Sequence, residues 1–153
     1  MITDLDESIK QLMIQKGAID PAEVDISFVT PDREWSGSIS KPTINFYLYD
    51  IREDTRLRSN EPLIERRSDG SVIKKRPPAR IQLFYCVTGW SPAQEDALGT
   101  KTREEHKQLS KALVALIKYP TIPPGVLSGD LIGQEPPLPT TVVLPDGMEN
   151  PDR

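Results

Sequence analysis

The sequence is poor in the side chains that enzymes use for metal binding and covalent catalysis. It contains one cysteine, Cys86, and one histidine, His106, in 153 residues. These counts exclude an internal disulfide and a His/Cys metal cluster, and no glycine-rich phosphate-binding motif is present. Carboxylates are frequent but scattered along the chain. We therefore expect a protein that is not an enzyme and that binds no cofactor and no metal.

Long apolar runs and an excess of basic charge are also missing. No apolar stretch reaches the roughly 18 residues of a membrane span, and the N-terminus lacks the basic and apolar regions of a signal peptide. The net charge is −4, whereas nucleic-acid-binding domains are usually basic. These absences predict a cytoplasmic protein with no direct membrane insertion and no nucleic-acid partner.

The most strongly patterned stretch that the chain does contain is residues 41–54. Its alternation places three apolar side chains on one side of a strand: Ile44, Phe46 and Leu48. The other side is amphipathic and aromatic, with Asn45, Tyr47, Tyr49 and Ile51. We predict a central strand of a sheet, with Phe46 in the core.

Two segments have the apolar spacing of amphipathic helices. Residues 2–16 form the first, with Thr3 as the predicted N-cap, Gly17 as the predicted stop and an apolar face of Leu5, Ile9, Leu12 and Met13. Residues 102–118 form the second, with Thr102 as the predicted N-cap and a predicted buried stripe of Leu109, Leu113, Leu116 and Ile117.

Residues 24–29 and 80–90 alternate apolar and polar side chains, which predicts two further strands. Cys86 falls inside the second strand, so we interpret it as a buried, inert thiol. We predict a loop just before the central strand. It carries Trp35, which is either a contact anchor or a lid folded over the core.

A β-hairpin is predicted at residues 63–76, because Asp69-Gly70 between two strand-like runs is a strong turn signal. Residues 63–80 hold six basic and two acidic side chains, a charge of +4, so the rest of the chain carries −8. The charges either solvate an exposed hairpin and block edge pairing, or dock on an acidic partner surface. The candidate binding residues are Arg66, Arg67, Lys74, Lys75 and Arg76.

The composition changes after the second helix. Eight of the 15 prolines fall in residues 119–153, with five acidic residues and one basic residue. This pattern predicts an extended arm or wrap rather than a part of the core. Its one strand-like run is a candidate for pairing with a partner's strand edge; it comprises Thr140, Thr141, Val142, Val143 and Leu144.

Together these segments predict an α+β domain over residues 1–119, followed by a proline-rich C-terminal arm over residues 120–153. The domain would hold a mostly antiparallel sheet of four to five strands flanked by two helices. At 153 residues the chain has room for one such domain with a single core.

Several motifs occur here in a recognisable order. Pro42 opens a strand that ends in Leu-Tyr-Asp and an acidic run to Asp54; a proline pair at 77–78 precedes the next strand; Glu-His follows at 105–106, and Pro-Pro-Gly at 123–125. This order resembles the tail-terminator (cap) family of extracellular contractile injection systems, phage-tail-like particles of the antifeeding-prophage type. Asp54 stands where the family often has asparagine, and the family pattern continues into a further helix and a last strand.

The resemblance implies a phage tail-terminator-like fold and a structural role. Such a protein forms a homohexameric ring on the last layers of the contractile sheath protein and the inner tube protein. The ring ends polymerisation and couples sheath to tube, and closed cyclic symmetry suits that task. We expect the chain to act as part of an assembled phage-tail-like particle. The alternative is a monomeric adaptor or assembly-chaperone binding module of such a particle.

Overall fold

The computed structural model describes residues 1–55, 61–77 and 79–142. In chain order, its elements are α1 (Ile2–Gln15), β1 (Asp25–Ser27), α2 (Arg33–Ser38), β2 (Thr43–Glu53), β3 (Leu63–Arg66), β4 (Val72–Lys75), β5 (Ile81–Trp90), α3 (Thr100–Lys118), η2 (Pro124–Val126) and η3 (Gly129–Leu131), the last two being 3-10 helices. They divide into unit 1, comprising Met1–Tyr47 and Val87–Arg153, and unit 2, comprising Leu48–Cys86. Strands β2 and β5 contribute to both units.

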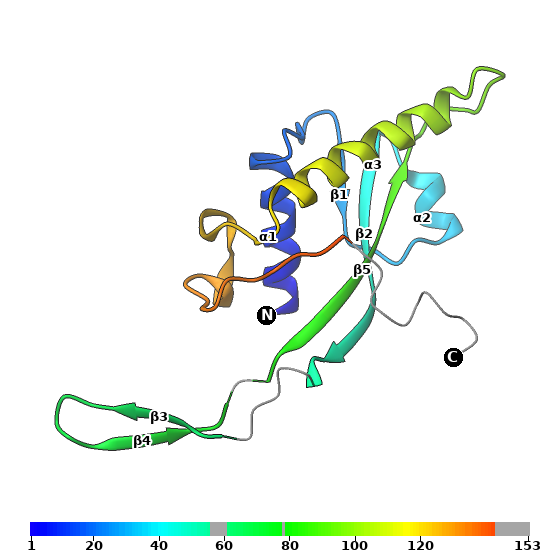
Figure 1. Ribbon diagram of the computed structural model, residues 1–153. Helices are drawn as coiled ribbons and strands as arrows, with labels where there is room; N and C mark the ends of the chain where they lie inside the picture. The colour runs from blue at the N-terminus through cyan, green and yellow to red at the C-terminus, as the bar shows by residue number, and fades with distance from the viewer. Residues whose placement is uncertain (56–60, 78, 143–153) are drawn as a thin grey trace. The chain divides into compact units, whose positions relative to one another are not determined.

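The α+β class is confirmed, but the predicted single, mostly antiparallel sheet is wrong. The strands form a three-stranded sheet in the order β1-β2-β5 and a separate two-stranded sheet of β3 and β4. β1 and β2 are parallel, with Ile26 opposite Ile44, whereas β3 and β4 are antiparallel. β2 and β5 run in opposite directions (Figure 1).

The parallel pair arises because the predicted loop with Trp35 is a helix. Asp32 caps α2: its side chain accepts a hydrogen bond of 2.7 Å from the backbone N–H of Trp35. A connection that contains a helix can return the chain to the same end of the sheet, so the next strand runs parallel to the last. A helix at this position therefore sets the direction of β2 against β1.

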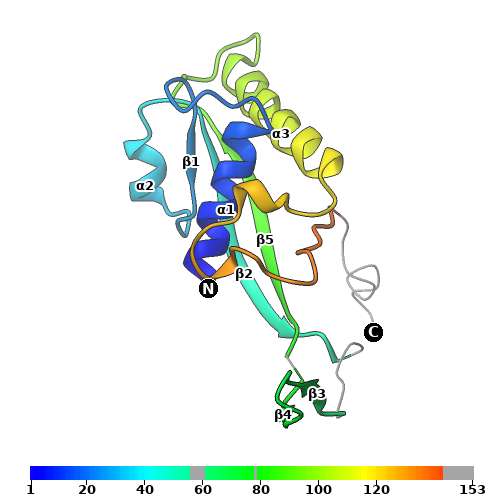
Figure 2. The ribbon, with the colours of Figure 1, turned by 90° about the vertical axis from the view of Figure 1, so that its left-hand side faces the viewer.

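Helices cover both faces of the sheet in unit 1. A side-chain carbon at Gly89 would lie 2.5 Å from the carbonyl oxygen of Glu105, so α3 crosses β5 at this glycine. The next residue, Trp90, forms a T-shaped ring contact with Trp35 in α2, with 5.4 Å between the ring centroids. Because consecutive strand residues point to opposite faces, α2 and α3 lie on opposite sides. Helix α1 contacts α3, and Figure 2 shows it in front of the sheet.

The core of unit 1 lies between the sheet and α1. Phe46 is 2% exposed, as predicted, and its ring stacks on Phe28 at 5.6 Å. From α1, three of the four predicted apolar residues are buried, namely Ile9, Leu12 and Met13. The buried Asn45 amide satisfies both the N–H and the carbonyl of Val29, at 3.1 and 3.0 Å. These two hydrogen bonds hold the segment just after β1 against β2 through a side chain rather than through strand pairing.

The helix boundaries are close to those predicted, but the capping residues differ. The N-cap of α1 is Met1 rather than Thr3, and that of α3 is Gly99 rather than Thr102. α1 ends just before Gly17, as predicted. The left-handed residue is Ala18, with φ 51°. Gly17 is required instead for close packing, because a side-chain carbon there would lie 2.6 Å from the carbonyl oxygen of Met13.

The segment after α3 contributes to the core, contrary to the prediction of an arm outside it. Three of its side chains are at most 8% exposed: Ile122, Val126 and Leu131. η2 and η3 both contact α1. The buried hydroxyl of Ser8 accepts a hydrogen bond of 3.0 Å from the Ser128 backbone N–H, which ties this segment to the helix. The described part of this segment is thus a wrap packed on α1, one of the two forms predicted, but it contributes to the core.

Candidate interaction surfaces

The residues that the structure describes include no group of three or more His, Cys, Asp and Glu side chains that could hold a metal ion. Cys86 is exposed, so its predicted burial is wrong, and His106 is also exposed. Across the same residues, no helix combines the length and the apolar character that a bilayer span requires. The surfaces of the molecule are therefore the candidates for function.

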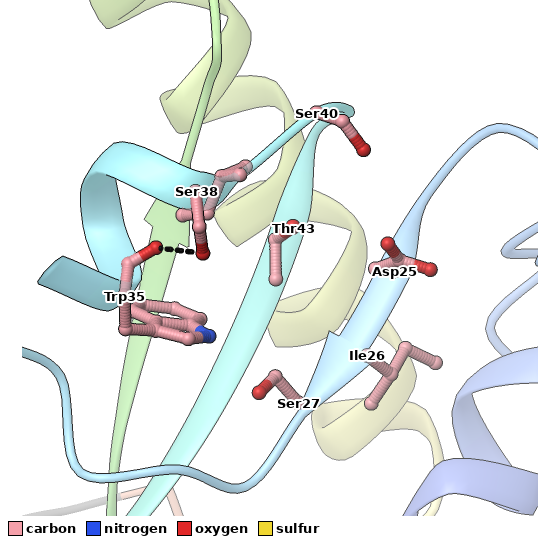
Figure 3. A pocket seen from close by; sticks show the side chains of 8 residues that line it. Asp25, Ile26, Ser27, Trp35, Ser38, Ser40 and Thr43 are labelled. Carbon is pink, nitrogen blue, oxygen red and sulfur yellow. Dashed lines mark hydrogen bonds between the residues drawn. The ribbon is translucent and has the colours of Figure 1, made fainter.

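A shallow hollow of about 250 Å³ lies on the α2 side of the sheet. Trp35 and Ser38 of α2 line it together with Asp25 and Ser27 of β1 and Thr43 of β2 (Figure 3). Its one carboxylate, on Asp25, forms an ion pair of 3.0 Å with Lys41. Because that charge is already paired, the hollow presents hydroxyl groups and an indole ring rather than a charged binding site.

The predicted hairpin is confirmed. β3 and β4 pair with Ile64 opposite Lys74 and Arg66 opposite Val72. Gly70 adopts the left-handed conformation, with φ 82°, that the turn requires. Directly opposed residues share a face, so these four side chains form one side of the hairpin, which we name face A. All four are exposed, two of them apolar and two basic.

The other side of the hairpin, face B, carries Glu65, Ile73 and Lys75. Glu65 and Lys75 form an ion pair, so the charges on face B cancel. The predicted basic cluster is thus divided by the register of the two strands. Arg66 and Lys74 lie on face A, Lys75 lies on face B, and Arg67 and Arg76 lie just beyond the strand ends. The excess positive charge of the strands is on face A.

The second set of predicted binding residues is already partly paired within the chain. Thr140 donates its backbone N–H to the carbonyl of Pro120 at 2.7 Å and its hydroxyl to the carbonyl of Tyr119 at 2.8 Å. Pro139 forms an isolated antiparallel bridge with Thr121. Of the others, Thr141 and Val142 are exposed, while Val143 and Leu144 lie outside the described residues.

α3 exposes apolar residues that the sequence pattern assigns to the core. Small or polar side chains face inward, namely Gln108, Ala112 and Ala115. Leu109 and Leu116 are half-buried, whereas Leu113 and Ile117 are 45% and 64% exposed. Val114 is also 64% exposed. We name Leu113, Val114 and Ile117 the α3 patch; half of the predicted buried stripe is in fact on the surface.

Strand β5 has two unlike sides within unit 2. Gln82 donates a hydrogen bond of 2.8 Å to Asp54. The centroid of the Phe84 ring lies 6.3 Å from the centroid of the Tyr49 ring and 5.5 Å from the guanidinium carbon of Arg52. Alternation places three residues on the opposite side, Ile81, Leu83 and Tyr85, which we name the Ile81 side. Ile81 is 42% exposed and the other two are half-buried. Sequence reasoning missed this surface because its pattern is that of an ordinary buried strand face.

Comparison with known proteins connects this fold to a family. The model of the family described as "Pvc16 N-terminal domain" matches residues 4–149, nearly the whole chain. The chain belongs to this family. The family assignment confirms the resemblance that the order of sequence motifs indicated.

A solved structure is also similar to this member of the family. It is a sheath/tube terminator of an extracellular contractile injection system, PVC, determined in the extended state. The TM-score is 0.58 at 22% sequence identity, a likeness that concerns the fold. The alignment covers 84% of this chain but only 42% of that one, so the chain spans less than half of the terminator's length. No curated protein matches the sequence.

Proposed function

We propose that this chain is a structural cap of a contractile injection system and has no catalytic role. A homohexameric ring of it would rest on the last layers of the contractile sheath and the inner tube, end their polymerisation and couple one to the other. The observation that carries this proposal is the family match over residues 4–149. The terminator-like fold supports it.

The distribution of burial supports a role in assembly. A cap needs a body that folds alone and surfaces that are satisfied only when it meets the polymer. Unit 1 contains all of the buried residues that the structure describes, and the described residues of unit 2 include none. A two-stranded sheet by itself is marginally stable in water. Unit 2 is therefore the part that we expect partners to cover.

For contact with sheath or tube, the hairpin remains the candidate. We propose that Arg66 and Lys74 of face A meet an acidic surface, with Arg67 and Arg76 beside them, and that Lys75 contributes less because it is paired with Glu65. Pairing through residues 140–144 is a weaker proposal, since the Thr140 amide already has an acceptor in the same chain.

The decisive experiment is electron microscopy of particles made without this chain. The cap proposal predicts sheaths and tubes of irregular length, with the regular length restored when the full chain is supplied. Particles of normal, uniform length in its absence would refute the proposal. Light scattering of the purified chain distinguishes the two modes of action: a cap ring has about six protomers, whereas an adaptor or assembly chaperone stays monomeric and is absent from finished particles.

A further inference from the structure

We infer that Ile64 and Val72, on face A of the hairpin, are the apolar anchors through which the hairpin binds. Its partner is a protein surface on which carboxylates lie beside apolar side chains. The inference rests on the proposed cap and deepens it, because it adds anchors to the hairpin contact and defines the chemistry of the partner. Both anchors are large aliphatic residues, and they are 61% and 53% exposed.

Face A is the side of the hairpin whose side chains lack partners. On face B, Lys75 and Glu65 form an ion pair, and Ile73 is half-buried. On face A, the side chains of Arg66 and Lys74 form no ion pair and no hydrogen bond with any residue that the structure describes. The unpaired charge and the exposed apolar area of the two strands therefore fall on the same side.

The turn holds the two strands in this register. The Asp69 carboxylate accepts hydrogen bonds from the Ser71 backbone N–H and hydroxyl, at 2.8 and 2.6 Å. The Arg67 N–H donates to the Ser71 carbonyl at 2.9 Å, and the Gly70 N–H donates to the Arg67 carbonyl at 3.0 Å. A surface that is ordered before binding loses less conformational entropy when its partner arrives.

The arrangement of side chains on face A defines the chemistry of the partner. Ile64 stands opposite Lys74, and Val72 stands opposite Arg66. Each aliphatic side chain thus has one cation across the ladder and the other cation two residues along its own strand. A partner that covers the aliphatic groups also removes water from the cations, which is unfavourable unless carboxylates meet them. The matching surface therefore combines apolar side chains with carboxylates.

The charge distribution favours a protein over nucleic acid or an anionic membrane. Both of these alternatives are extended arrays of negative charge, and the chain outside residues 63–80 carries −8, so the rest of the molecule would be repelled. A phosphate backbone also offers no apolar surface to Ile64 and Val72. A protein can confine its carboxylates to the area that the hairpin contacts.

Binding of the full-length chain to particles made without it tests this inference. Ile64→Thr and Val72→Thr change face A, and Ile73→Thr is the matched control on face B; threonine keeps the β-branched shape that suits a strand. In co-sedimentation, each face A variant should bind about tenfold more weakly than the wild type at low and at high salt. Ile73→Thr should bind like the wild type. Arg66→Gln with Lys74→Gln should weaken binding mainly at low salt, because salt screens exposed charges.

The other outcomes are also decisive. Amide NMR shifts of Gly70 and Ser71 check that each variant keeps the turn. Equal weakening by Ile64→Thr and Ile73→Thr, or none by either, would overturn the inference. Binding to duplex DNA, or to vesicles of phosphatidylcholine and phosphatidylglycerol, that Ile64→Thr abolishes would overturn the choice of a protein partner.

The same particles separate this inference from the proposed function. If the face A variants bind normally but particles made without the chain vary in length, the cap stands and these anchors are wrong. If the face A variants lose binding but particles made without the chain keep their normal length, the hairpin contact stands and the cap proposal fails.

Discussion

Units 1 and 2 share two strands but differ in what holds them together. Unit 1 has helices on both faces of its sheet and a core that includes the fully buried Leu12, Met13 and Ile44. Unit 2 is made of strand pairs, and none of its described residues is buried. Apolar burial supplies most of the free energy of folding. The contrast indicates that unit 1 folds on its own contacts and that unit 2 depends on its strand ladders and on whatever covers it.

The largest expected effect is a difference in stability between truncations of two aromatic residues in β2. Phe46→Ala in unit 1 should lower the free energy of unfolding by about 3–5 kcal/mol, because it empties a buried, stacked ring site. Tyr49→Ala in unit 2 should cost less than about 1 kcal/mol, since Tyr49 is 42% exposed. Urea unfolding of the purified chain measures both. Equal costs would mean that unit 2 contributes to a shared core.

A smaller effect is expected at the crossing of α3 and β5. Gly89→Ala should destabilise unit 1 by about 1–3 kcal/mol, because the new carbon would meet the Glu105 carbonyl oxygen at 2.5 Å and force the helix away. Gly37→Ala is the matched control: it lies in α2 with no atom within 4 Å, and should be neutral or slightly stabilising. In thermal melts, the melting temperature of Gly89→Ala should fall, whereas that of Gly37→Ala should stay unchanged or rise slightly.

The hairpin should show the reverse behaviour, with little effect on stability and a large effect on docking. Arg66→Glu with Lys74→Glu reverses the charge of face A, while Lys75→Glu changes face B. Both proteins should melt within a few degrees of the wild type, because exposed charges contribute little to stability. Co-sedimentation with assembled particles should fall for the face A variant and much less for Lys75→Glu. Equal losses would show that net charge, rather than the face, is recognised.

The sequence predicted those elements whose signals are local. Apolar alternation located the central strand and Phe46, helical spacing located α1 and α3, and Asp69-Gly70 located the hairpin turn. The order of motifs led to the family. Each of these depends on residues close together in the chain, where periodicity and turn chemistry act directly.

The errors arose where tertiary contacts decide. α2 is a six-residue helix, too short to show a periodic pattern, and missing it left the parallel β1–β2 pair unpredicted. A cap signal was present in Asp32, followed two residues later by Glu34. α3 has apolar residues around much of its circumference, so spacing alone cannot say which set faces inward. The close approach at Gly17 and Gly89 decides that only in the folded chain.

The smallest expected effect concerns a bonding pattern that the two units share. In unit 1, hydrogen bonds from the Thr100 hydroxyl and backbone N–H to Asp96 lower the pKa of that carboxyl below its ordinary value of 3.8. In unit 2, the hydroxyl and N–H of Ser71 lower the pKa of Asp69 in the same way. A folded-state pKa below the unfolded value stabilises the fold above about pH 4, and this contribution is lost as the pH falls through the folded pKa.

NMR titration of the carboxyl carbons tests whether local bonding is alike in the two units. Both carboxyl groups should titrate below 3.8 in the wild-type chain. Thr100→Val should raise the pKa of Asp96 and leave that of Asp69 unchanged, and Ser71→Ala should do the converse, so each variant is the other's control. If both behave this way, hydrogen bonding in the turns is equivalent, and the difference between the units lies in their burial. If Asp69 titrates normally while Asp96 does not, the turn of unit 2 is not held as the structure shows, and its weakness begins with local bonding.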